Sequence, residues 1–120
     1  MDKDITIEEL KNKVQVFCEV RDWDQFHNPK DLAIGISTEA GELLDIFRFK
    51  TQEQMDTMLQ DKEKRESIEE EVSDIFYFIL RFAQLYDIDL AKALIDKLAK
   101  NDLKYPVEKS KGKNNKYNEI

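Results

Sequence analysis

The sequence predicts an all-α fold, and its turn residues, its apolar spacing and its composition carry that prediction. Only 3 glycines and 2 prolines occur among 120 residues, and none lies between Gly41 and Pro106. β-Sandwiches and barrels need such residues between their many short strands, so an all-β fold is excluded. Hydrophobic residues make up 41% and charged residues 38%, which is typical of one globular domain with a highly charged surface.

Two helices have clear starts near the amino terminus. Thr6, directly before Ile7-Glu8-Glu9, is typical of an N-cap, and its helix is expected to run to about residue 21. A polar connector with aromatic residues follows over 22–28. Asn28 and Pro29 are preferred types for an N-cap and a first turn, which predicts a second helix from there to about residue 50.

Two more helices are predicted after residue 50. Segment 51–61 is polar with three apolar residues, so the sequence is compatible there with either a short helix or a mobile linker. A third, long helix is expected over 62–86. Asp87 or Asp89 caps a fourth, which ends near Leu103 because Tyr105 precedes Pro106. The predicted fold is therefore an all-α four-helix bundle.

Charge divides the chain near residue 104. The net charge is −7, but residues 104–120 hold five lysines against two glutamates, a net of +3, which leaves −10 for the body. We therefore expect a helical domain, 1–103, and a basic tail, 104–120, which by composition alone would be a disordered, solvated chain. An acidic body argues against a nucleic-acid polymer or an anionic membrane as partner. With no basic, apolar leader and no apolar run near the roughly 20 residues of a membrane span, a cytoplasmic protein is expected.

Four carboxylates occupy positions where a helical protein buries apolar side chains. At the helical repeat, Glu39 falls inside the apolar arc of the second helix beside Ile46, and Glu42 lies at its edge. Glu71 lies in the same way on the third helix, with Asp74 at the margin. Neither stripe contains a lysine or an arginine, and a buried charge without a partner is costly. A hard divalent cation that prefers oxygen ligands, such as Mg²⁺, is the better compensation.

Considered alone, the run Glu69-Glu70-Glu71 is also compatible with a solvated acidic helix start favoured by the helix dipole. Two acidic pairs on the apolar faces of adjacent helices make that interpretation less convincing. A ferritin-like di-iron site needs histidine ligands on helices, and the only histidine, His27, lies in a connector. The single cysteine, Cys18, excludes an internal disulfide and is expected to be a buried, apolar thiol.

The motifs Glu39-Ala40-Gly41-Glu42 and Glu71-Val72-Ser73-Asp74 resemble a known signature. It is the Glu-x-x-Glu and Glu-x-x-Asp pair of the all-α nucleoside triphosphate pyrophosphohydrolases, the MazG-like superfamily. Segments 21–29 and 46–50 resemble its dCTP pyrophosphatase branch in order and spacing. The resemblance covers about residues 14–118, nearly the whole chain.

The resemblance implies a hydrolase that cuts a nucleoside triphosphate between its α- and β-phosphates, giving a monophosphate and pyrophosphate. Mg²⁺, with Mn²⁺ able to substitute, would be held by the residues that also act in catalysis: Glu39, Glu42, Glu71 and Asp74. The implied substrate is dCTP or a modified dCTP, and the implied assembly is a dimer or tetramer of identical chains. The alternative is a non-catalytic helical protein that binds or senses metal–nucleotide without hydrolysing it.

The resemblance also assigns residues to the phosphates. Lys97, Asn101 and Tyr105 would contact them, and their i, i+4, i+8 spacing places them on one helix face. Lys116 and Tyr117 in the basic tail would close over the phosphates. Without the resemblance, these residues would be a solvated stripe and a solvated tail.

The base pocket implied by the resemblance is aromatic. Its residues would be His27, Trp23, Phe26, Phe49 and Phe78, with His27 as the polar contact to the base. The chain departs from the branch at Phe49, where tryptophan is usual, and at Phe78, where an aromatic with a hydroxyl is usual. Both departures bear on the selectivity for base and sugar.

Overall fold

A long helix, α4 (Lys62–Leu85), organises the first part of the structure, a computed structural model that describes all residues, 1–120. The expected all-α class is confirmed, because the chain forms helices and no strand. In order, the other elements are α1 (Ile7–Glu19), η1 (Asp24–Phe26), α2 (Pro29–Phe47), α3 (Gln52–Gln60), α5 (Leu90–Lys104), α6 (Val107–Ser110) and η2 (Tyr117–Glu119), where η is a 3-10 helix.

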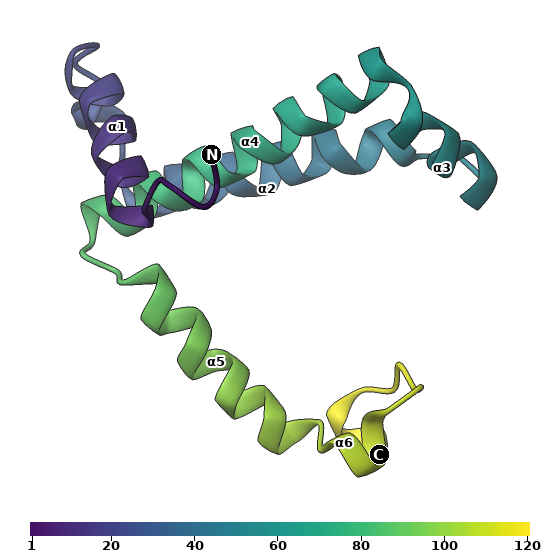
Figure 1. Ribbon diagram of the computed structural model, residues 1–120. Helices are drawn as coiled ribbons and strands as arrows, with labels where there is room; N and C mark the ends of the chain where they lie inside the picture. The colour runs from purple at the N-terminus through teal and green to yellow at the C-terminus, as the bar shows by residue number, and fades with distance from the viewer. The chain divides into compact units, whose positions relative to one another are not determined.

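The chain divides into two units, Met1–Asp87 and Ile88–Ile120. In the first unit α1, α2 and α3 all pack against α4. Figure 1 shows α2 and α4 side by side along most of their length, running in opposite directions, with α3 where the chain turns back. The closed four-helix bundle stays a prediction. None of the helices combines the length and apolar character that crossing a membrane requires.

The predicted helix starts are confirmed. The Thr6 hydroxyl accepts a hydrogen bond of 3.1 Å from the backbone N–H of Glu9, and the Asn28 side chain accepts one of 2.8 Å from that of Asp31. The second helix ends at Phe47, three residues before the expected end, because the chain leaves the helical conformation and Phe49 has a φ of +63°.

Segment 51–61 is a helix, α3, which settles the alternative left open by the sequence. Its start is held by a reciprocal pair of bonds, in which the Thr51 hydroxyl accepts from the Gln54 N–H and the Gln54 side-chain oxygen accepts from the Thr51 N–H. Such a capping box satisfies two amides that the helix itself cannot bond. The buried side chain of Met58 fixes α3 against the rest of the unit.

The core of the first unit is small. Its buried members are Cys18, Leu32, Met58, Ile68, Leu80, Ala83 and, unexpectedly, the charged Arg81. Cys18 is the buried thiol that the sequence predicts, with its Sγ 3.1 Å from the Tyr77 hydroxyl, and burial raises the pKa of that hydroxyl. Val72, beside Glu71 on α4, is 49% exposed. The apolar faces of α2 and α4 are therefore only partly covered within one chain.

The second unit contains α5 and the tail. Asp89, the second of the two expected caps, accepts the Lys92 N–H at 2.9 Å, and α5 buries none of its residues. The tail that composition alone would leave as solvated chain forms α6 and η2. The rings of Tyr105 and Tyr117 meet edge to face with centroids 6.3 Å apart, so the tail folds back on the end of α5.

Candidate metal centre

Three of the four predicted carboxylates come together between α2 and α4. Glu39, Glu42 and Glu71 each offer one oxygen, and these oxygens all lie within 4.8 Å of one another. Glu39 and Glu71 are half-buried because they lie on the faces by which the two helices pack, and Glu42 is exposed at the edge. The arrangement follows from the sequence pattern, in which both helices carry a glutamate inside an apolar arc.

The cluster lacks an internal counter-charge. Oε2 of Glu39 and Oε2 of Glu71 are buried and have no hydrogen-bond partner, and none of the ion pairs of the structure includes either residue. Buried carboxylate oxygens without partners are expected to bind a proton or a cation. Hard divalent cations take oxygen ligands at short distances, so these three carboxylates fit Mg²⁺ or Mn²⁺.

The pKa values of the cluster agree with a site that is short of positive charge. The pKa of Glu39 is raised to about 7, chiefly by the neighbouring side chain of Glu42, then by burial and by the charges of Glu42, Asp74 and Glu71. The pKa of Glu71 is also raised, first by burial and then by the side chain of Glu42. Near neutral pH the cluster therefore holds a proton that a cation would displace.

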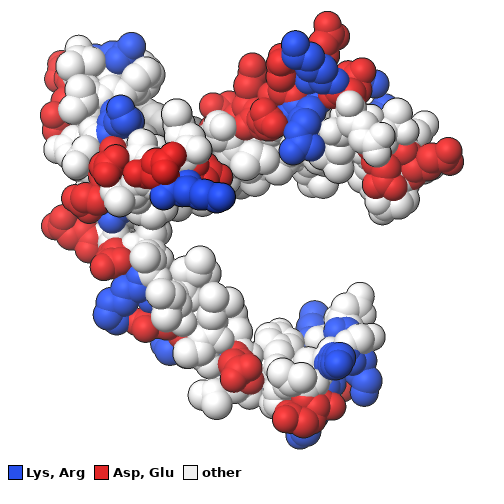
Figure 2. All heavy atoms as spheres, viewed as in Figure 1, with Lys and Arg blue, Asp and Glu red and all other residues white.

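The fourth predicted carboxylate, Asp74, lies at the margin. It is exposed and is not one of the three residues that meet within 4.8 Å. Its charge still raises the pKa values of Glu39 and Glu71, so it contributes to the negative field of the cluster. Figure 2 shows acidic side chains gathered along the α2–α4 pair, with basic side chains among them where α4 begins.

The predicted base residues Trp23, Phe26 and His27 lie in and beside η1, before the start of α2. The rings of Trp23 and His27 meet edge to face with centroids 6.5 Å apart, while Phe26 is exposed. His27 Nδ1 accepts a hydrogen bond of 2.9 Å from Nε of Arg81 on α4. This group is therefore held at one end of the α2–α4 pair.

The other two predicted base residues differ from each other in position. The Phe78 ring packs on α2 at Gly35, where a Cβ atom would lie only 2.5 Å from it. Phe49 follows the far end of α2, is 88% exposed, and has the Arg48 guanidinium 4.7 Å from its ring centre. At 1.5 Å per residue, His27 and Phe49 are about 30 Å apart along α2, with the carboxylates between them. One chain alone does not bring the five predicted base residues into one pocket.

The predicted phosphate residues all belong to the second unit. Lys97 and Asn101 lie one turn apart on α5, and Tyr105 is its C-cap. Tyr117 lies against Tyr105, and the ammonium of Lys104 is 5.0 Å from the Tyr117 ring centre. Within this unit, then, two of the predicted phosphate residues, Tyr105 at the end of α5 and Tyr117 in the tail, are in contact.

Arg81 is the structural residue that sequence reasoning missed. It is 0% exposed and donates to His27 Nδ1, to Gln84 Oε1 at 2.6 Å and to an oxygen of Asp24, with which it forms an ion pair. It forms its ion pair with Asp24 and none with the glutamate cluster. Its position in the apolar run Phe78-Ile79-Leu80-Arg81-Phe82 was the available signal, because a charged residue there needs a buried partner.

Known proteins share both the sequence pattern and the fold. Residues 34–120 match the MazG-like family. The chain is 31% identical over 115 residues to dCTP pyrophosphatase 1 of Rattus norvegicus, covering 96% of this chain and 68% of that protein, and 30% identical to the Homo sapiens protein of that name over the same shares. The crystal structure of a pyrophosphatase from Archaeoglobus fulgidus has a TM-score of 0.78 and 33% identity, covering 83% of this chain and 92% of that one.

Proposed function

The chain belongs to the MazG-like family of nucleotide pyrophosphatases, and on that premise we propose that it hydrolyses a nucleoside triphosphate between the α- and β-phosphates. The products would be a nucleoside monophosphate and pyrophosphate. The observation that carries the proposal is the meeting of Glu39, Glu42 and Glu71 within 4.8 Å, with two buried oxygens that have no partner.

The three glutamates would hold Mg²⁺ or Mn²⁺, with Asp74 adding negative charge beside them. When bound, the cation supplies Lewis-acid stabilisation of the charge that develops on the phosphate oxygens. The carboxylates would fix its position between α2 and α4. Glu39, with a pKa of about 7, can release its proton on cation binding at neutral pH. A carboxylate of the cluster would then accept the proton of the attacking water.

Residues of the second unit would bind the polyphosphate. Lys97 supplies an ammonium, Asn101 an amide and Tyr105 a hydroxyl, which are suitable donors to phosphate oxygens. Lys116 and Tyr117 would close over the same phosphates. The packing of Tyr117 on Tyr105 supports a shared role, because it keeps tail and helix residues together.

For the base we propose dCTP or a modified dCTP as the preferred substrate. Trp23, Phe26, Phe49 and Phe78 would provide the apolar walls, and His27 the polar contact. Because its Nδ1 already accepts from Arg81, only the Nε2–H of His27 is free. It would donate to a ring nitrogen or carbonyl of the base edge.

A dimer or tetramer of identical chains is part of the proposal. His27 and Phe49 lie about 30 Å apart in one chain, so a pocket that uses both needs a second copy. The exposed apolar side chains of the α2–α4 pair, including Leu44 at 70% and Val72 at 49%, would be covered by that copy. Light scattering after gel filtration tests the assembly, and a monomer with full activity would contradict it.

The direct test of function is pyrophosphate release across the common ribonucleoside and deoxyribonucleoside triphosphates and a few modified pyrimidines, with and without Mg²⁺. We expect Mg²⁺-dependent release, fastest with dCTP or a modified dCTP. Faster hydrolysis of dUTP or a purine nucleotide would overturn the substrate assignment alone. A non-hydrolysable triphosphate that raises the melting temperature, together with no release from any substrate, would favour a non-catalytic nucleotide-binding protein.

A further inference from the structure

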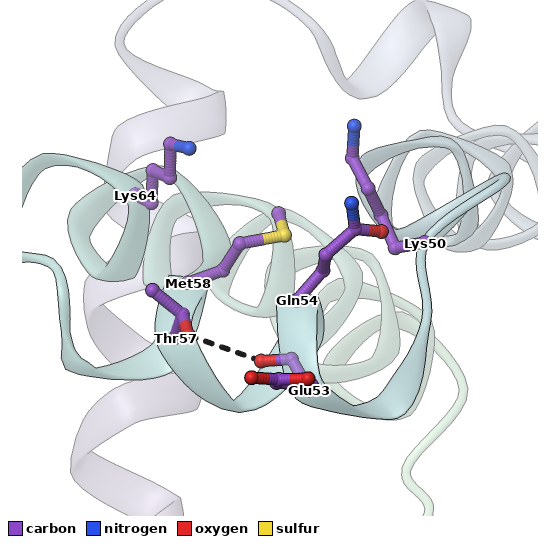
Figure 3. A pocket seen from close by; sticks show the side chains of 6 residues that line it. All are labelled: Lys50, Glu53, Gln54, Thr57, Met58 and Lys64. Carbon is purple, nitrogen blue, oxygen red and sulfur yellow. Dashed lines mark hydrogen bonds between the residues drawn. The ribbon is translucent and has the colours of Figure 1, made fainter.

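A cavity of about 300 Å³ lies beside α3, away from the three glutamates. It is lined by Lys50, Glu53, Gln54, Thr57, Met58 and Lys64 (Figure 3). Its floor is the buried thioether of Met58. Its volume is at the lower end of the range for ligand pockets, which suits a small ion and not a whole nucleotide.

Three hydrogen-bond donor groups lie on one side of this cavity. Figure 3 shows the ammonium groups of Lys50 and Lys64 and the amide of Gln54 on one side of Met58, with Glu53 on the other side. Neither lysine takes part in an ion pair, although the chain carries a net charge of −7. Two ammonium groups that line one hollow, neither of them in an ion pair, repel each other and favour an anion between them.

The Gln54 amide is oriented by the capping box of α3. Its oxygen accepts the Thr51 N–H at 2.8 Å, so the oxygen is committed to the helix start. The amide nitrogen, which can only donate, is left for the cavity. Three donor groups, two of them charged, therefore line this side of the hollow.

We propose that this cavity is a binding site for a phosphate-class anion, with inorganic pyrophosphate as its ligand. Lysine binds phosphate as a point charge, and two ammonium groups with an amide can meet the two phosphoryl groups of pyrophosphate. The site is separate from the glutamate cluster and needs no metal. Only the choice of pyrophosphate rests on the proposed function, because that reaction would release it nearby.

The site lies within reach of that product. Lys64 and Glu71 are seven residues apart on α4, so they share a helix face and are about 10 Å apart along the axis. Lys50 lies just beyond the carboxyl end of α2, on the α3 side of Glu42. Pyrophosphate that leaves the glutamate cluster toward α3 would meet the two lysines first.

The test is calorimetric titration of the full chain with inorganic pyrophosphate in EDTA. Without a divalent cation the glutamate cluster repels anions, so binding there does not contribute. We expect binding that weakens with rising ionic strength, is about tenfold weaker in Lys50→Gln/Lys64→Gln, and is retained in the matched variant Lys62→Gln, which changes a lysine of the same helix outside the cavity. A charge-keeping Lys50→Arg/Lys64→Arg variant should restore much of the affinity, which separates loss of charge from loss of fold.

Parallel titrations distinguish the ligand. Weaker binding of inorganic phosphate than of pyrophosphate supports the assignment, and equal binding would reduce it to a site for a single phosphate group. Absence of binding in EDTA, or equal affinity in the double glutamine variant and the parent, would overturn the proposal. Because the titration contains no nucleotide and no metal, either result is independent of whether the chain hydrolyses triphosphates.

Discussion

Nε of Arg81 donates a hydrogen bond of 2.9 Å to Nδ1 of His27, which joins α4 to the connector before α2. Because Nδ1 is the acceptor, the ring proton is on Nε2 and the imidazole is neutral. Burial lowers the pKa of His27, the Arg81 charge lowers it further, and the Asp24 charge partly opposes both. One buried arginine thus decides which atom of a predicted base-binding residue is free.

His27 should remain neutral at pH values where an ordinary histidine is half protonated. As the only histidine of the chain, it gives an unambiguous signal in ¹H–¹⁵N spectra of the ring nitrogens. We expect the Nε2–H tautomer and a titration midpoint below 6.5 in the parent, moving upward in Arg81→Met. A proton on Nδ1, or a midpoint unchanged by the substitution, would contradict the role given to Arg81.

Replacing Asp24 should lower the free energy of unfolding more than replacing its ion-pair partner Arg81. Asp24→Ala leaves a fully buried guanidinium without its counter-ion and should lower the free energy of unfolding by about 3 kcal/mol. Arg81→Met removes the buried charge itself and should cost less, about 1 kcal/mol. Denaturant titrations of both variants and of the double variant measure the coupling, and a larger cost for Arg81→Met would refute this ordering.

Two glycines of α2 should respond oppositely to alanine. At Gly35 a Cβ would lie 2.5 Å from the Phe78 ring, so Gly35→Ala should destabilise the fold by about 1–3 kcal/mol. At Gly41 no atom lies within 4 Å of the added Cβ, so Gly41→Ala should stabilise the helix by about 0.5–1 kcal/mol. Free energies of unfolding provide the comparison. If Phe78→Leu fails to relieve the cost of Gly35→Ala, the contact with the ring is not its cause.

The raised pKa of Glu39 predicts a pH dependence of stability in the absence of metal. Between its usual value near 4.5 and its folded value of about 7, the folded chain holds a proton that the unfolded chain has lost. Stability contributed by this group therefore falls as pH rises through that window. Glu39→Gln removes the group, so the unfolding free energy of the parent in EDTA should decline more steeply with pH than that of the variant.

Mg²⁺ should stabilise the fold more at high pH than at low pH, because it must displace the same proton from Glu39. The rise in melting temperature caused by Mg²⁺ should be larger above pH 7 than below it, and smaller at every pH in Glu39→Gln. A shift that is equal at all pH values would mean that the cation does not bind at Glu39.

Much of the fold and the acidic cluster could be predicted from the sequence because the signals are local. Thr6, Asn28 and Asp89 mark helix starts through bonds to residues only three positions away. Glu39 and Glu71 stand out because each interrupts an apolar face, and the period of the helix alone reveals that.

The residues that the sequence did not reveal depend on distant partners. Arg81 is buried because Asp24 and His27, 57 and 54 residues away, supply its acceptors. The cavity lysines Lys50 and Lys64 are ordinary surface residues until α3 forms between them. The helix itself was left open because its polar composition is ambiguous, and the Thr51–Gln54 capping box decides it. Pairing across such separations leaves no periodic trace in one sequence.

Glu71→Gln tests most directly whether the glutamate cluster is the metal centre of a nucleotide pyrophosphohydrolase. The substitution keeps the shape of the side chain and removes one ligand charge, while Glu70→Gln makes the same change at an exposed neighbour outside the cluster. Mg²⁺-dependent pyrophosphate release from dCTP is the measurement, with circular dichroism to show that both variants remain helical. We expect release to be abolished in Glu71→Gln and retained in Glu70→Gln, whereas undiminished turnover in Glu71→Gln would contradict the account.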